Sequence, residues 1–170
     1  MAKRIALHFP RLWKAFLYLL VTTNWGTGVA WFSLHRWYRV QGEFGEEFSP
    51  WEPRLLRIHG GSAMLMMIYF GYLLASHVPV GIRSRRNRIL GITLLSVVGF
   101  LILTAYGLYY SWGEEFKEWV SWAHLIAGLS LPVVLFLHIW TGHTSGVEKA
   151  GKTRKASAKP FEGAIVLTKD

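Results

Sequence analysis

The chain has 170 residues, of which 52% are hydrophobic, 15% are aromatic and only 17% are charged, and it contains no cysteine. This composition is typical of a membrane protein, and the length allows one domain. The absence of cysteine excludes haem attached through C-x-x-C-H, thiolate-bound iron–sulfur clusters, thiolate catalysis and disulfides. The net charge of +9 is confined to the ends of apolar runs, so it indicates membrane topology and disfavours nucleic-acid binding.

Four uncharged stretches are long enough to cross a bilayer, because about 30 Å of hydrocarbon requires about 20 apolar helical residues. We expect membrane-spanning helices near residues 13–34, 55–78, 89–110 and 119–141. The predicted fold class is all-α, an integral membrane four-helix bundle built from residues 1–144. The first stretch lacks a small-residue cleavage site and is interpreted as an uncleaved signal anchor. Pro79 is expected to end the second helix, and Pro132 is expected to kink the fourth.

The distribution of basic residues predicts that both termini are cytoplasmic. The segment up to Lys14, the loop 79–90 and the segment after Trp140 carry four, four and six Lys or Arg residues, whereas the loops on the other side carry five together. Loops rich in Lys and Arg remain in the cytoplasm. Residues 145–170 are expected to form a flexible basic cytoplasmic tail.

Four histidines occupy matched positions in the second and fourth predicted spans. His59 and His77 are 18 residues apart, and His124 and His138 are 14 residues apart. At about 100° per residue, each spacing returns the second histidine to nearly the same helix face as the first. Both spans run from the outer to the inner side of the membrane. His59 and His124 therefore form an outer pair, and His77 and His138 form an inner pair.

Each pair offers the two imidazoles that bis-histidine ligation of a b-type haem requires, and ionisable residues at membrane depth are usually functional. We therefore predict that the four histidines are the metal ligands of two haems per chain. Gly60 beside His59, and Gly128 one turn after His124, are expected to let the porphyrin approach the backbone, and Arg57 to pair with a haem propionate. The alternative is a haem-free bundle in which the histidines hydrogen-bond between helices.

Two histidines are candidates for one ligand of the inner haem. At about 1.5 Å per residue, the two levels are about 27 Å apart along the second span but about 21 Å apart along the fourth, and helix tilt absorbs only part of this difference. His8, which precedes the first span, is the alternative to His77 as the partner of His138. His35 and His143 lie at span ends and are expected to be interfacial.

Five segments carry a resemblance to the bacterial four-helix dihaem b-type cytochromes, which include b561-type cytochromes and the cytochrome b subunits of formate dehydrogenases and hydrogenases. These segments are Arg57-Ile58-His59-Gly60-Gly61, Ser76-His77-Val78, Leu103-Thr104-Ala105-Tyr106-Gly107, Trp122-Ala123-His124 and His138-Ile139-Trp140-Thr141-Gly142. The resemblance covers residues 8–143. Many members of the family have a ligating histidine followed by tryptophan before the first helix, whereas this chain has His8-Phe9.

The resemblance implies a multi-pass electron-transfer protein of the bacterial inner membrane, in a respiratory chain. It would pass electrons between a quinone pool and a partner redox subunit or soluble cytochrome. Quinol oxidation also requires a proton acceptor, and the titratable candidates at the membrane faces are His35, His143, Glu52 and Glu118. The outer loop 35–54 is the expected docking surface for a redox partner, or else a simple connection between spans.

Two other classes of function compete with electron transfer. A haem-free membrane anchor or assembly subunit would use the same aromatic-rich helices to hold a larger complex together. A small metal-dependent membrane enzyme would require converging Asp or Glu ligands, and none of the spans contains one. The chain also has too little mass outside the spans for a flavin or molybdenum domain. A subunit of an oxidoreductase complex is therefore favoured over a complete enzyme.

Overall fold

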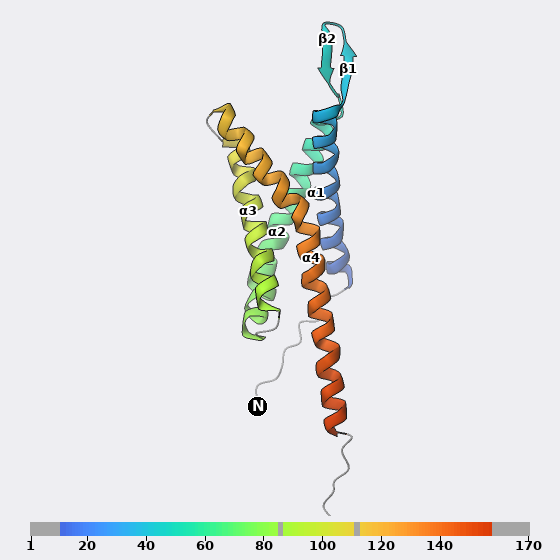
Figure 1. The fold of residues 1–170 in the computed structure, drawn as a ribbon, viewed down its shortest axis with the longest axis vertical. Coiled ribbons are helices and arrows are strands. Elements are labelled where there is room, and N and C mark those ends of the chain that lie inside the picture. Colours follow the sequence, from blue (N-terminus) through green and yellow to red (C-terminus); the bar gives the residue numbers. More distant parts are fainter. Residues whose placement is uncertain (1–10, 85–86, 111–112, 158–170) are drawn as a thin grey trace, which may run out of the picture.

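The computed structural model describes residues 11–84, 87–110 and 113–157, with side chains described as far as residue 142 apart from Ser84. The described chain forms four helices and one β-hairpin (Figure 1). In chain order these are α1 (Arg11–Trp37), β1 (Arg39–Gly42), β2 (Gly45–Phe48), α2 (Glu52–Ser84), α3 (Arg88–Tyr110) and α4 (Glu114–Ser157). The prediction of four helices is confirmed.

Local sequence signals account for where α2 and α4 begin. Pro53 lies in the first turn of α2, where its missing N–H removes no helical hydrogen bond. The amide of Glu52 donates to the Ser49 carbonyl at 3.0 Å and so begins the first turn. Gly113, with φ of 105°, turns the chain directly before α4. Acidic residues in the first turns of both helices complement the positive end of the helix dipole.

Two helices extend beyond their predicted ends. Pro79 lies inside α2, which continues to Ser84, so the expectation that Pro79 ends this helix is wrong. A proline deletes one backbone hydrogen bond, and long apolar helices packed against neighbours tolerate this loss. The fourth helix continues to Ser157, so the first part of the segment expected to be a flexible tail is helical. Pro132 lies inside α4, whose axis changes direction along its length (Figure 1).

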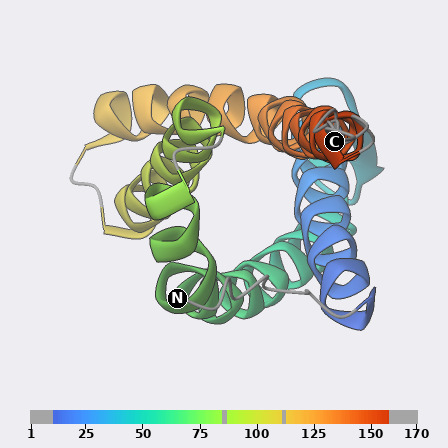
Figure 2. The same cartoon turned by 90° about the horizontal axis from the view of Figure 1, so that it is seen from below.

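The four helices form a ring when seen from one end (Figure 2). The principal contacts pair α1 with α2 and α3 with α4, and contacts of α1 with α4 and of α2 with α3 close the ring. Helices α2 and α4 consequently lie on opposite sides of the bundle. Side chains of these two helices that point inwards therefore meet across its centre.

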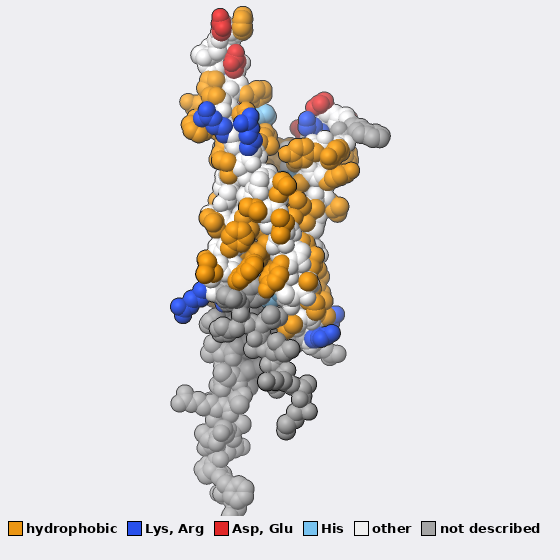
Figure 3. Space-filling view, turned by 180° about the vertical axis from the view of Figure 1, so that it is seen from behind, with side chains coloured by type: hydrophobic (Ala, Val, Ile, Leu, Met, Phe, Trp, Pro, Cys, Tyr) orange, Lys and Arg blue, Asp and Glu red, His pale blue; other side chains and the backbone are white. Residues whose placement is uncertain are grey.

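The surface of the bundle is largely apolar. Among the described hydrophobic side chains only Leu20, Val21 and Tyr69 are buried, while Ile89 is 82% exposed and Leu103 is 71% exposed. Orange apolar side chains cover the middle of the bundle, and blue and red charged side chains lie towards its ends (Figure 3). Such a large exposed apolar surface is not expected of a soluble monomer.

Three helices are long and apolar enough to cross a membrane: α2 over Glu52–Arg83, α3 over Arg88–Tyr110 and α4 over Glu114–Gly142. The first helix covers the predicted span 13–34 but is not among them. Its central segment 22–28, Thr-Thr-Asn-Trp-Gly-Thr-Gly, lowers its mean hydropathy.

The fold is mostly helical, as predicted, but the connection between α1 and α2 contains a β-hairpin that the sequence analysis did not anticipate. The strands β1 and β2 pair antiparallel with Gly42 opposite Gly45, which leaves a two-residue turn at Glu43 and Phe44. Gly45 has φ of 123°, a conformation that side chains with a Cβ rarely adopt. The Phe48 ring stacks on His35 of α1 at 4.8 Å, so the hairpin is packed against the end of the bundle.

Candidate functional site

The two predicted histidine pairs come together in the structure. The ring centroids of His59 and His124 are 6.2 Å apart, with an interplanar angle of 73°. The ring centroids of His77 and His138 are 6.3 Å apart, with an interplanar angle of 79°. In each pair one imidazole comes from α2 and the other from α4. The unequal spacings along the sequence, 18 and 14 residues, are thus accommodated by the arrangement of the two helices.

These separations suit two imidazoles on opposite sides of one metal ion. Bonds from an imidazole nitrogen to a metal are about 2.0–2.1 Å long, and with about 1.1 Å from that nitrogen to the ring centre, the two centroids would be about 6.3 Å apart. Among the described residues no group of three or more His, Cys, Asp or Glu side chains could hold a metal ion. Within the described residues each pair thus offers two imidazole ligands, a number that fits a metal ion whose other ligands come from a planar macrocycle such as porphyrin.

The outer imidazole on α2 is oriented by α1. His59 Nδ1 lies 3.0 Å from the Asn24 carbonyl oxygen and 3.1 Å from Thr27 Oγ1. Because a carbonyl oxygen only accepts, Nδ1 carries the hydrogen and Nε2 keeps its lone pair for a metal. A Cβ placed on Gly28 would be 3.2 Å from His59 Cε1, so the glycine gives this ring the space it occupies.

The outer imidazole on α4 has a matching arrangement with α3. Thr104, which is only 8% exposed, places Oγ1 2.8 Å from His124 Nδ1. The same hydroxyl donates to the Phe100 carbonyl oxygen at 2.8 Å. Since the hydroxyl has one hydrogen, it accepts from His124 Nδ1, and Nε2 is again left with its lone pair. Both outer histidines are therefore held in the tautomer that a metal ligand requires.

The inner pair has a different support. Asn87 Nδ2 donates to the His138 carbonyl oxygen at 2.6 Å, and the same nitrogen lies 3.4 Å from His138 Nδ1. The longer separation is beyond the usual range of a hydrogen bond, so it leaves the His138 tautomer open. Gly91 packs against this ring, because a Cβ there would be 3.4 Å from His138 Cε1. The alternative inner ligand, His8, lies outside the described residues.

The other predicted site residues make few close contacts in the structure. A Cβ on Gly60 would be 3.9 Å from the Tyr109 hydroxyl, and a Cβ on Gly128 would be 3.9 Å from Leu101, so neither glycine is tightly packed. Arg57 is exposed and lies two residues from His59, about 200° around α2. The side chain of His143 lies outside the described part of the chain, whereas His35 pairs with Glu52 at 2.8 Å.

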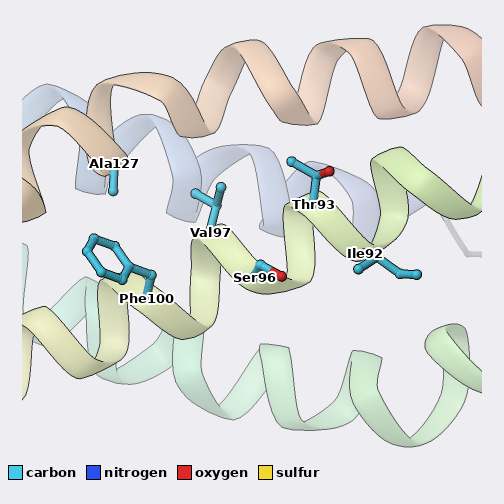
Figure 4. A pocket seen from close by; sticks show the side chains of 6 residues that line it. All are labelled: Ile92, Thr93, Ser96, Val97, Phe100 and Ala127. Carbon is cyan, nitrogen blue, oxygen red and sulfur yellow. The ribbon is translucent and has the colours of Figure 1, made fainter.

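An open cavity of about 460 Å³ lies against α3 (Figure 4). Its lining comes from α3 except for one residue of α4: Ile92, Thr93, Ser96, Val97, Phe100 and Ala127. On α3 this lining lies between Gly91, which packs against His138, and Thr104, which bonds to His124. The cavity therefore lies between the levels of the two histidine pairs.

Sequence reasoning missed the residues that orient the imidazoles: Asn24, Thr27, Gly28, Asn87, Gly91 and Thr104. A signal was present for Thr27 and Thr104, because hydroxyl side chains are uncommon inside apolar helices and often hydrogen-bond to another helix, whereas Asn24 acts through its main-chain carbonyl. The partner of each such side chain depends on how α1 packs on α2 and α3 on α4, which the sequence pattern does not specify.

Comparisons with known proteins found no matching family model, no matching curated protein and no matching solved structure.

Proposed function

We propose that this protein is a membrane b-type cytochrome that transfers electrons through two haems, each bound by one histidine pair. The observation that carries the proposal is the separation of 6.2 Å in the outer pair and 6.3 Å in the inner pair. Helix packing alone could bring a single pair of histidines to this separation. Two pairs from the same two helices, at the separation that a shared metal ion requires, favour two copies of one type of site.

The donor atoms also fit haem iron. Neutral imidazoles are its usual protein ligands, and a hydrogen bond to the second ring nitrogen fixes their orientation. Asn24, Thr27 and Thr104 provide such acceptors for the outer pair. When bound, haem would supply one-electron redox chemistry. The histidine pairs would hold it and leave it no open position for a substrate, and the chain would adjust its potential through these hydrogen bonds.

Lipid contact is part of the proposal. The apolar surface of α2, α3 and α4 suits a bilayer, and α1, although more polar in its middle, packs along α2. We propose the predicted orientation, with both termini in the cytoplasm of a bacterial cell, since Lys and Arg are enriched in the two terminal segments and in loop 79–90, which lie on one predicted side of the membrane. The two haems would then lie at different depths, in line for transfer across the inner membrane. A quinone pool and a partner redox protein are the proposed exchange partners.

A reconstitution experiment tests this function. The purified protein is inserted into liposomes that contain ferricyanide, and dithionite is added outside. We expect ferricyanide to be reduced in liposomes that contain the wild-type protein, and the rate to fall to the level of empty liposomes for His59→Ala and for His138→Ala. Tyr106→Phe, a change at a side chain that is 65% exposed, serves as the control and is expected to retain the wild-type rate. Wild-type liposomes that reduce ferricyanide no faster than empty ones would contradict the proposal.

A further inference from the structure

The two-stranded sheet of β1 and β2 stands clear of the helices at one end of the bundle (Figure 1). Outside the ladder between these two strands, residues 39–48 form no backbone hydrogen bond with any described residue. In an antiparallel pair, every second residue of each strand turns its N–H and C=O away from its partner. Both outer edges of the hairpin therefore present backbone groups to which a further strand could bond.

The base of the hairpin is fixed to the bundle. The Phe48 ring stacks on His35 at 4.8 Å and 4°, and His35 stacks in turn on Trp31 at 4.7 Å and 14°. His35 Nδ1 lies 2.8 Å from Glu52 Oε2, which joins the ends of α1 and α2. Arg39 Cζ lies 3.9 Å from the centroid of the Phe48 ring. An isolated hairpin is marginally stable in water, so these contacts hold the two edges in the extended form that an added strand requires.

The hairpin carries three exposed acidic side chains, Glu43, Glu46 and Glu47, and none of them forms an ion pair in the described part of the chain. The one basic residue of segment 39–48, Arg39, lies over the Phe48 ring. Red acidic side chains mark the tip of the hairpin in Figure 3, beyond the apolar part of the bundle. Glu46 and Glu47 are adjacent in β2, so their side chains point to opposite faces of the sheet. The β2 edge is therefore negatively charged on both faces.

The charge and the position of this edge argue against three kinds of occupant. Carboxylates are costly at membrane depth, so the hairpin does not receive a helix within the bilayer. A second copy pairing through β2 would bring Glu46 and Glu47 of both copies together, and like charges on paired strands are destabilising. Ser157, the last described residue, lies at the opposite end of the bundle, so the segment that follows it starts far from the hairpin (Figure 1).

We propose that β2 is the docking edge for a soluble protein, which adds an extended segment rich in Lys and Arg to the sheet as a third strand. Main-chain hydrogen bonds to the edge give the affinity, and basic side chains on the two faces of the added strand lie beside Glu46 and Glu47. Phe44, which is 93% exposed at the turn, extends the contact beyond the end of the strand. The proposal does not rest on haem, because none of these residues belongs to a histidine pair.

Binding is measured by fluorescence anisotropy with the protein in nanodiscs of phosphatidylcholine, a lipid without net charge. The probe is the labelled peptide Thr-Lys-Lys-Val-Thr-Lys-Lys-Val-Thr, whose β-branched residues favour a strand and whose paired lysines reach both faces. One comparison peptide is methylated at every backbone amide nitrogen, and the other has Glu in place of Lys. We expect the probe to bind about tenfold more tightly than either. Equal affinity for the probe and a comparison peptide, or no binding of the probe, would overturn the proposal.

Protein variants test which acidic side chains the probe meets. We expect the double variant Glu46→Gln, Glu47→Gln to lose affinity for the probe about tenfold. The matched control, Glu114→Gln with Glu115→Gln, removes the same charge from the first turn of α4 and should bind as the wild type does. Equal losses in the two variants would show that the probe senses only the net charge, and would overturn the assignment to β2. A wild-type dimer that the probe dissociates in sedimentation would assign the edge to a second copy and would overturn it as well.

Discussion

The imidazoles of His59 and His124 face each other across the bundle, with their ring centroids 6.2 Å apart. The two helices that carry these rings, α2 and α4, make little direct contact with each other, because α2 packs mainly on α1 and α4 mainly on α3. The facing rings are thus held from behind, by Asn24, Thr27 and Thr104, and not by each other. This arrangement is suited to receive an ion between the rings without moving the helices.

The inner ligand can be identified by substitution. We expect His77→Ala to lose one of two haems, because the His77 ring is the one that faces His138 at 6.3 Å. His8→Ala is the matched variant and should keep both haems. Haem per chain is measured as the pyridine haemochrome of the purified protein. Loss of one haem in His8→Ala, with both kept in His77→Ala, would show that the first histidine of the chain is the ligand.

Hydrogen bonds to the outer imidazoles should adjust the reduction potential of the outer haem. Thr104→Val removes the hydroxyl that accepts from His124 Nδ1 at 2.8 Å, so the ring becomes a weaker electron donor and the potential rises. Only the difference in strength of this bond between the oxidised and reduced states changes the potential. A hydrogen bond is worth about 1 kcal/mol, and about 1.4 kcal/mol corresponds to 59 mV for one electron, so a rise of at most about 40 mV is expected.

Thr27→Val is the matched control for Thr104→Val. His59 Nδ1 keeps the Asn24 carbonyl as an acceptor at 3.0 Å, so the rise should be smaller. Redox titration followed in the visible haem bands measures both potentials. An equal shift in the two variants, or a fall in Thr104→Val, would be inconsistent with the tautomers assigned to the outer pair.

A methyl group at Gly28 should disturb the outer imidazole. In Gly28→Ala the added Cβ would be 3.2 Å from His59 Cε1, whereas in Gly26→Ala it would meet no atom within 4 Å. Both changes bring the same gain in helix propensity, so their difference reports the contact with the ring. We expect Gly28→Ala to release one haem faster than Gly26→Ala in detergent, as followed by transfer to apomyoglobin. Equal release rates would argue against a haem on His59.

The connection between α2 and α3 should depend on the backbone at Asn87. This residue has φ of 52°, and its side chain donates to the His138 carbonyl oxygen at 2.6 Å. Asn87→Ala and Asn87→Gly both lose that hydrogen bond, but only alanine is strained by about 1–2 kcal/mol in this conformation. Asn87→Ala should therefore melt at a lower temperature than Asn87→Gly in the same detergent. The reverse order would contradict the positive φ.

Much of the helical fold could be predicted from the sequence because apolar runs of sufficient length leave few alternatives to a helix. The hairpin could not be found in this way, since only the four residues of β1 alternate between exposed and less exposed positions while β2 is exposed throughout, and its pairing depends on the turn beside Gly45. The extension of α2 past Pro79 also depends on packing, because the same proline ends a helix when no neighbour supports the next turn.

The facing histidines could be predicted because the helical period relates positions within one helix directly to a face. The residues behind them could not, because Thr27 and Thr104 gain their partners only when α1 is packed on α2 and α3 on α4. Thr104 lay within a segment that resembles the dihaem cytochromes, but its contact with His124 required the structure.

The central claim is most directly tested by the pyridine haemochrome of the wild-type protein, purified in detergent after expression with ample haem, alongside His59→Ala. We expect two b haems per wild-type chain and one per His59→Ala chain. A wild-type protein without haem, or a His59→Ala chain that keeps both, would contradict it.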